Sequence, residues 1–155
     1  MSQIIETVDV DVPVRVAYDQ WTQFEEFPRF MKAVEKVEQL NDTTIRWTAQ
    51  IASVTKSWTA KITQQEPDER VAWTAIEGAK NAGVVTFHRL DDRKTRVTLQ
   101  LDVEPEGPLE SVGDALGFVA RQAKDDLKNF KEFIEQQGVP TGAWRGEVRQ
   151  DDVAG

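Results

Sequence analysis

An alternation of apolar and polar residues runs through almost half of this chain, from residue 33 to residue 104. Its clearest stretch holds Val97, Leu99, Leu101 and Val103, each separated from the next by one polar residue. A period of two is typical of strands with one buried face and one solvated face. Because short turns separate these stretches, consecutive strands are predicted to pair antiparallel. The chain must therefore form a sheet with one apolar face that another element covers.

Turn-forming residues divide this region into six strands, and a seventh is predicted over residues 4–12, before the sheet region begins. The turns are expected at residues 41–42, 52–53, 67–68, 78–81 and 91–93. A two-residue loop at 52–53 would place Trp47 opposite Trp58 and Ala49 opposite Lys56. A hairpin closed at 67–68 would place Ile62 opposite Trp73.

One long helix is the only predicted element large enough to cover the apolar face of the sheet. Gly107-Pro108 opens it, and Gly138 followed by Pro140 ends it. Its apolar stripe recurs at intervals of three and four residues, at Leu109, Val112, Leu116, Val119, Ala123, Leu127, Phe130 and Ile134. Two shorter helices are predicted at 13–22 and 24–31, with a break near Pro28. The predicted fold is α+β, a seven-stranded antiparallel sheet curved around the C-terminal helix.

The chain is predicted to hold one folded domain over residues 1–138, followed by a tail over residues 139–155. The tail loses all periodicity, so it is expected to be mostly disordered. Trp144 is its one aromatic residue, and the alternative is a tail that docks on the folded domain through this indole.

Composition removes several common kinds of chemistry. The chain has no Cys and one His, which exclude disulfides, thiol catalysis and a multi-histidine metal site. A net charge of −8 argues against a nucleic-acid partner. We therefore expect no cofactor and no metal. No leader pattern and no apolar run long enough for an integral membrane segment is seen, so the default expectation is a cytoplasmic protein of undefined oligomeric state.

Several local segments carry a resemblance to a known family. They include Val12-Pro13-Val14, Tyr18-Asp19-Gln20-Trp21 and the segment from Phe24 to Met31, with its Phe-Pro-Arg-Phe-Met run. Residues 82–87 and 95–99 add to them. Over about residues 3–137 the chain resembles the START-like polyketide cyclase/dehydrase (SRPBCC) superfamily, in particular its bacterial cyclase/dehydrase branch. The resemblance implies the helix-grip fold and a deep apolar cavity between the sheet and the long helix.

An aromatic wall is the strongest candidate for a binding surface. By the predicted register, Trp47, Trp58 and Trp73 lie on one concave face, where they either line a ligand cavity or only pack as core. The candidate ligand-binding residues are Phe27, Phe30, Met31, Trp47, Trp58, Trp73, Phe87, Leu116, Val119, Ala120 and Ala123. Gly113 and Gly117 either leave space for a ligand or permit close contact with the sheet.

Polar candidates for catalysis are few. Glu6, Lys56 and Arg89 share the parity of inward-facing apolar neighbours, so they could orient the polar end of a ligand or stabilise an enolate. The alternative is that strand ends turn these side chains outward or that a bulge reverses the parity. His88 has the opposite parity to Phe87 and is expected on the outer face.

Three functions are compatible with this reading. The first is binding or carriage of a small hydrophobic molecule, such as a quinone, a lipid or a polyketide, without catalysis. The second is an enzyme, an aromatase/cyclase that folds a poly-β-keto chain. The third is a protein-interaction module like the ribosome-associated toxins of the same superfamily, which the net charge of −8 disfavours.

Overall fold

The computed structural model of the chain describes residues 2–51, 53–104 and 109–149, with the backbone alone at residue 2 and at 109–112. The expectations for Ala52 and for Gly107-Pro108 therefore fall outside the described residues. The elements are β1 (Ser2–Val10), α1 (Val14–Trp21), the 3₁₀ helix η1 (Phe24–Arg29), β2 (Val34–Asn41), β3 (Thr44–Ile51), β4 (Val54–Glu66), β5 (Arg70–Gly78), β6 (Asn81–Asp91), β7 (Lys94–Val103) and α2 (Leu109–Gln137).

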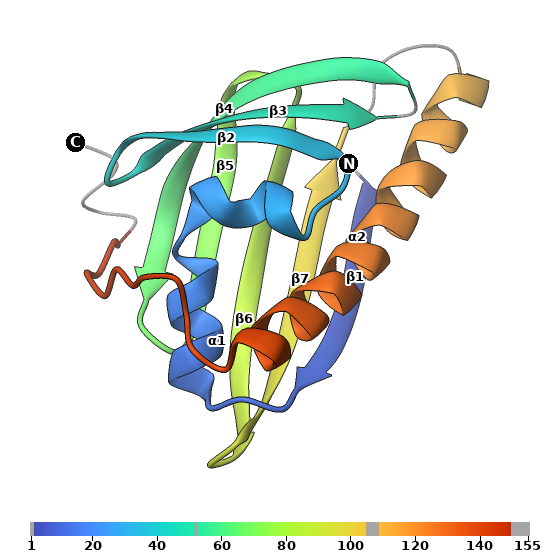
Figure 1. Cartoon of the computed structure of the whole chain (residues 1–155). Helices are drawn as coiled ribbons and strands as arrows, with labels where there is room; N and C mark the ends of the chain where they lie inside the picture. The colour runs from blue at the N-terminus through green and yellow to red at the C-terminus, as the bar shows by residue number, and fades with distance from the viewer. Residues whose placement is uncertain (1, 52, 105–108, 150–155) are drawn as a thin grey trace.

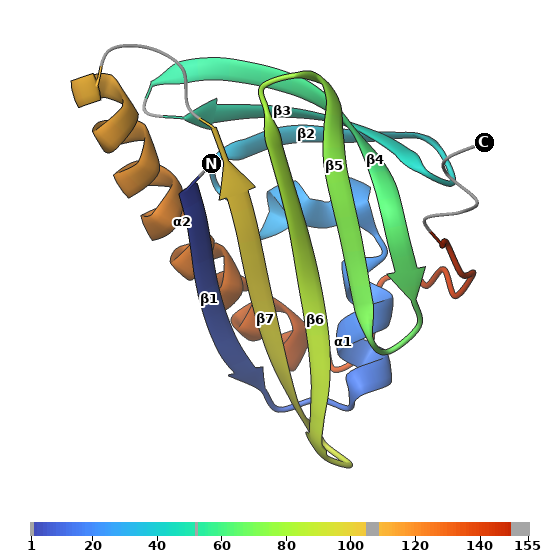
Figure 2. The same cartoon turned by 180° about the vertical axis from the view of Figure 1, so that it is seen from behind.

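The seven strands form one antiparallel sheet in the order β1-β7-β6-β5-β4-β3-β2. The helices α1, α2 and η1 all lie on one side of this sheet (Figure 1). The view from behind shows that the other face of the sheet is free of helices (Figure 2). The predicted α+β helix-grip architecture is confirmed, because the sheet buries its apolar face against α2 and the short helices.

The second short helix differs from the prediction of a helix over 24–31. It is a 3₁₀ helix that ends at Arg29 and contains Pro28. Proline has no backbone N–H and cannot form the bond that an α-helix needs at this position, so the segment stays short and tightly wound. Its two phenylalanines, Phe24 and Phe27, are still buried in the core.

The turn at 67–68 is longer than predicted, yet the predicted pairing of Ile62 with Trp73 is correct. Glu66 pairs with Arg70, which leaves three residues in the turn, and an irregularity between Ile62 and Gln64 restores the register. A bulge adds one residue to one strand and reverses the facing of the residues beyond it. This bulge turns Gln65 inward, where it is almost fully buried.

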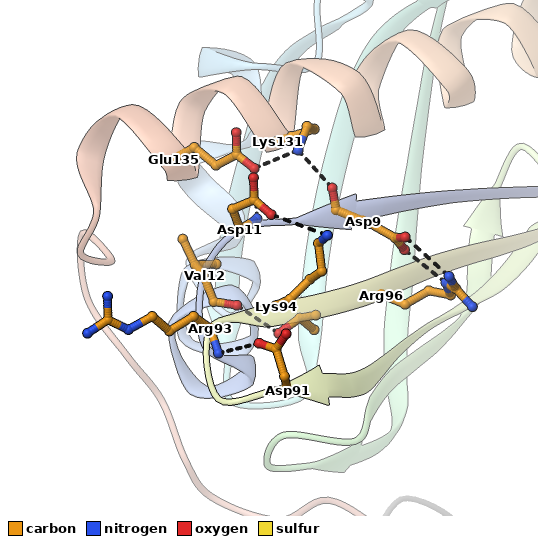
Figure 3. Close-up of polar contacts among 10 residues, drawn as sticks. Asp9, Asp11, Val12, Asp91, Arg93, Lys94, Arg96, Lys131 and Glu135 are labelled. Atoms are coloured by element: carbon orange, nitrogen blue, oxygen red, sulfur yellow. Dashed lines mark hydrogen bonds and ion pairs between the residues drawn. The ribbon is translucent and has the colours of Figure 1, made fainter.

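The C-terminal half of α2 is fastened to the end of β1 (Figure 3). Lys131 Nζ donates to the Asp9 carbonyl at 2.9 Å and to Glu135 Oε2 at 2.6 Å. The same carboxylate oxygen accepts from the Asp11 N–H at 2.7 Å. Among the residues of α2 whose side chains are described, 113–137, the buried ones also lie in this half, at Ala123, Leu127, Phe130 and Ile134. The N-terminal half has no buried residue over 113–122 and covers the sheet more loosely.

The first part of the tail, residues 139–149, lies against α1 and the β4–β5 turn. The Trp144 N–H donates to Thr22 Oγ1 at 3.1 Å, and the half-buried indole packs against the core. Val148 is more deeply buried and forms an antiparallel bridge with Gln65. Arg145 donates to Asp19 Oδ1 at 2.5 Å and to Asp68 Oδ2 at 2.8 Å.

These contacts hold the described tail residues against α1 and the β4–β5 turn. Of the tail residues that make these contacts, Trp144 alone is predicted from the sequence, and Arg145 and Val148 are not.

Candidate functional site

A cavity of about 540 Å³ lies between the concave face of the sheet and α2. Its volume is within the range of pockets that hold drug-sized ligands. Most of its wall is apolar. Trp21, Phe24 and Phe27 come from α1 and η1, while Ile45, Ile62 and Leu99 come from three different strands. All six of these side chains are buried, so this end of the cavity is closed.

The mouth of the cavity is at the other end, where the lining residues are exposed. Val54 and Lys56 contribute from the start of β4, and Lys80 from the β5–β6 connection. Glu104, just after β7, and Asp114 on α2 complete the rim. The charged groups of the wall are therefore concentrated where water reaches them, with one exception on α2.

Three tryptophans form one wall of the cavity. Trp47 and Trp58 are paired across β3 and β4, as predicted, and their rings stack with centroids 5.8 Å apart and planes 11° apart. Phe27 packs on Trp47 with a centroid distance of 5.4 Å. The three indoles also belong to the packed core or contact it, so they are at once core and cavity wall.

The third indole, Trp73, depends on a glycine in the next strand. Gly83 is its partner across β5 and β6. A Cβ at Gly83 would lie 2.5 Å from Cζ2 of Trp73, which is closer than two such atoms can approach. The absent side chain therefore creates the space in which this indole lies. The Trp73 Nε1–H donates to Asn81 Oδ1 at 3.4 Å, which fixes the other side of the ring.

We expect Gly83→Ala to push the Trp73 indole into the cavity and to lower the free energy of unfolding by about 1–3 kcal/mol, as overpacking does. Gly113→Ala is a matched control, because a Cβ there meets nothing within 4 Å. Alanine is the better helix former, so this control should stabilise the protein by up to about 1 kcal/mol. Urea unfolding of both variants measures the contrast, and equal effects would contradict the proposed role of Gly83.

The exception among the charged groups is Asp126 of α2, which lines the interior of the cavity. Its Oδ1 atom is buried and has no hydrogen-bond partner among the described residues. Burial, with a smaller contribution from the neighbouring Asp125 charge, raises the pKa of the Asp126 carboxyl to about 7. Near neutral pH this group can accept or donate a proton inside an apolar cavity.

Asp126 is not among the residues predicted from the sequence, although its position on the apolar stripe of the long helix is a signal for an inward side chain. It lies three residues after Ala123 and four before Phe130, both on the apolar stripe of the helix. A carboxyl on such a stripe faces the interior.

The predicted ligand-binding residues divide into two groups. Those that line the cavity are Phe27, Met31, Trp47, Trp58, Trp73, Val119 and Ala123. Those that are absent from its lining are Phe30, Phe87, Leu116 and Ala120.

The residues of the second group lie outside the cavity lining for two reasons. Phe87 packs on Tyr18 at 5.4 Å because α1 occupies its end of the concave face, and Phe30 packs on Phe130 at 5.3 Å in the core. Leu116 and Ala120 are on α2, where the cavity faces the neighbouring side of the helix, at residues 115, 118, 119, 122 and 126.

The structure does not bring Glu6, Lys56 and Arg89 together, so the expectation of one polar group formed by all three is wrong. Glu6 lines a separate, smaller cavity between β1 and α2. Arg89 is exposed in the β6–β7 hairpin and pairs with Asp92. Lys56 pairs with Ala49 as predicted but is exposed at the mouth, because this end of the strand reaches solvent.

The two glycines of α2 make no close contact with the sheet. A Cβ at Gly113 would meet nothing within 4 Å, and one at Gly117 would meet only the Arg121 side chain at 3.4 Å. Of the two alternatives for these glycines, close packing on the sheet is therefore wrong, and space for a ligand stays a prediction. His88 is exposed, as expected from its parity.

A seven-stranded antiparallel sheet that grips a long helix, with an apolar cavity between the two, defines the START-like class of proteins. The chain belongs to the polyketide cyclase/dehydrase and lipid transport family, whose model matches residues 10–132. None of the helices in the described parts of the chain is long and apolar enough to cross a membrane.

Similar proteins are found among both sequences and solved structures. An uncharacterized 17.2 kDa protein of Streptomyces lincolnensis is 56% identical over 149 residues, which cover 96% of this chain and 99% of that protein. The crystal structure of DR_A0006 from Deinococcus radiodurans is 27% identical, with a TM-score of 0.68, and the match covers 89% of this chain and 100% of that one. The Zhui aromatase/cyclase from Streptomyces sp. R1128 has a TM-score of 0.78 at 18% identity, with 92% and 99% covered, and this likeness concerns the fold alone.

Proposed function

We propose that this protein binds a small hydrophobic molecule in the cavity between the sheet and α2. The observation that carries the proposal is the cavity itself, which combines a volume of about 540 Å³ with a closed aromatic end and an open, charged mouth. Water forms few hydrogen bonds with apolar walls, so the free energy falls when an apolar molecule replaces it. Membership of a family that includes lipid transport proteins supports the proposal.

The proposal is tested by filling the cavity. Val119 lines it and is half-buried, whereas Lys124 lies on the same helix with an exposed side chain. Nile red, a neutral dye, should bind the native protein with blue-shifted emission. Val119→Trp should abolish this signal and Lys124→Trp should preserve it. Equal emission from the two variants would place the dye elsewhere.

The natural ligand is sought in protein purified from its own host. Native mass spectrometry should show a bound organic molecule on the native protein that is missing from Val119→Trp. If the native protein always has its bare mass, and Nile red does not distinguish the two variants, the proposal is overturned.

A second candidate function is an aromatase/cyclase, and Asp126 is the observation that favours it. Ring closure in a poly-β-keto chain begins with removal of a proton from a methylene group between two carbonyls. A carboxyl with a pKa of about 7 inside the cavity is suited to accept that proton. Co-expression with a polyketide synthase that lacks its own cyclase tests this function. The native protein should change the ring pattern of the products, and Asp126→Asn should not.

A further inference from the structure

The C-terminal end of α1 has polar side chains that the protein buries. Asp19 and Gln20, in the last turn of the helix, and Thr22, just after it, are at most 5% exposed. A polar group removed from water costs free energy unless it finds a hydrogen-bond partner in the protein. Each of these three side chains has a partner in the tail, so the tail supplies hydrogen bonds that this end of α1 needs.

The tail runs beside α1 (Figure 1) and bonds to it through side chains on both partners. The Thr141 N–H donates to Gln20 Oε1 at 2.8 Å, and the Gln20 amide donates to Thr141 Oγ1 at 3.0 Å. Arg145 uses two nitrogens for two carboxylates, Asp19 on α1 and Asp68 in the β4–β5 turn. Its planar guanidinium therefore ties the helix to the turn, which the single nitrogen of a lysine cannot do in the same way.

Another side of the same helix end belongs to the cavity. Trp21 lies between Gln20 and Thr22 in the chain, is 2% exposed and lines the closed end of the cavity. Its ring packs on Phe27 at 5.2 Å and on Phe130 at 5.1 Å. None of the described tail residues lines the cavity. The tail and the cavity therefore contact different sides of one short segment, and a shift of this segment changes the contacts on both.

We infer that the tail positions the closed end of the cavity, and that Arg145 is its main positioning residue. This inference rests on the proposed binding function, and it makes the affinity for a hydrophobic molecule depend on a segment outside the cavity. When the tail leaves α1, Asp19 and Gln20 lose their partners in it, and the helix end shifts together with Trp21. Because coupling between two binding events is reciprocal, a molecule in the cavity also holds the tail in place.

The affinity for Nile red tests the effect of the tail on the cavity. In the full chain, Arg145→Ala should raise the dissociation constant of the dye at least about fivefold, the lower end of common coupling between sites. Arg145→Lys keeps the charge but reaches one carboxylate at a time, so it should recover only part of the affinity. Arg96→Ala is the matched control, because it removes an exposed arginine that donates two bonds to Asp9, and it should leave the constant unchanged.

Trypsin tests the effect of the cavity on the tail, in the native protein and without any variant. Trypsin can cleave after Arg145 only when the tail has left its place, because the guanidinium is otherwise bonded to two carboxylates. Saturating Nile red should slow this cleavage by the factor found for the dissociation constant, at least about fivefold. Cleavage after Arg93, which is exposed in the β6–β7 hairpin, is the internal control and should keep its rate. Mass spectrometry of the fragments separates the two cuts.

Fluorine NMR distinguishes positioning from a general loss of stability. With 5-fluorotryptophan in place of tryptophan, the five indoles give separate signals, which single Trp→Phe variants assign. Well below its melting temperature, Arg145→Ala should shift the Trp21 signal. The signal of Trp73, which lies in β5 and bonds to Asn81, should stay in place.

The outcomes separate this inference from the function on which it rests. If Arg145→Ala binds Nile red as tightly as the native protein, or if the dye does not slow cleavage after Arg145, the inference is overturned and the binding function stands. An unchanged Trp21 signal in Arg145→Ala overturns the inference as well. If the native protein binds no dye, the binding function loses its support, and the Trp21 signal alone decides whether the tail positions this end of the cavity.

Discussion

Replacing Asp126 by Asn is expected to stabilise this protein in alkaline solution far more than in acid. The unfolded carboxyl has a pKa of 3.8, whereas burial raises the pKa in the folded state to about 7. Between these values the folded protein keeps the proton and the unfolded chain loses it. Stability therefore falls as the pH rises from about 4 to about 7 and stays low above that.

The expected size of this effect follows from the interval of about three pH units, each worth about 1.4 kcal/mol. At about pH 8.5, Asp126→Asn removes a penalty on the order of 4 kcal/mol, and at about pH 5 less than half of this penalty is present. Asparagine has nearly the same shape, so the effects of packing are similar at both pH values and cancel in the comparison.

Urea unfolding at the two pH values measures this difference. Asp125→Asn is the control, because the neighbouring carboxyl is exposed on the same helix. The gain of the Asp126 variant over the native protein should grow with pH, while that of the control should change little. A gain that is the same at both pH values would show that the Asp126 carboxyl is well hydrated in the folded protein.

A chain that ends at Gly138 is expected to lose about 3–5 kcal/mol of stability relative to one that ends at Arg149. The segment between them contributes the buried Val148 and the half-buried Trp144, each worth roughly 1.5–3 kcal/mol when fully buried. It also contributes Arg145, which forms an ion pair with the nearly buried Asp19 carboxylate. Without Arg145, the ion-pair partner that remains for Asp19 is Arg15, which is exposed and 3.7 Å away. Removing one partner from such a pair leaves a poorly compensated charge.

A reference chain and a point variant make this prediction independent of gross misfolding. The chain that ends at Arg149 removes only residues 150–155, so it serves as the reference. Arg145→Ala keeps the tail but breaks its bonds to Asp19 and Asp68, and should cost part of the same free energy. If the chain that ends at Gly138 melts at the temperature of the reference, the tail contributes nothing to the folded state.

The sheet and its strand pairings could be predicted from the sequence because they depend on local information. The residue alternation defined which face each strand buries, and short turns defined which residues meet. The pairs Trp47–Trp58 and Ala49–Lys56 follow from the length of one hairpin. The pair Ile62–Trp73 was also correct, but only because a bulge compensated for a turn one residue longer than expected.

The site was less predictable because it depends on how α2 is placed on the sheet. Contacts between residues far apart in the chain, such as Lys131 with Asp9, hold the C-terminal half of the helix against β1. They define which side of its N-terminal half faces the cavity, and so exclude Leu116 and Ala120 while including Val119.

By itself, then, the sequence determined the sheet, its register, the aromatic wall and the long helix, since each follows from residue spacing along a few neighbouring strands or turns. Only the tertiary structure decided that Oδ1 of Asp126 is buried without a hydrogen-bond partner among the described residues, that Lys56 lies at the mouth of the cavity, and that Val148 pairs with Gln65. Burial and pairing of this kind depend on contacts between distant segments, and no local pattern of residues encodes the geometry of those contacts.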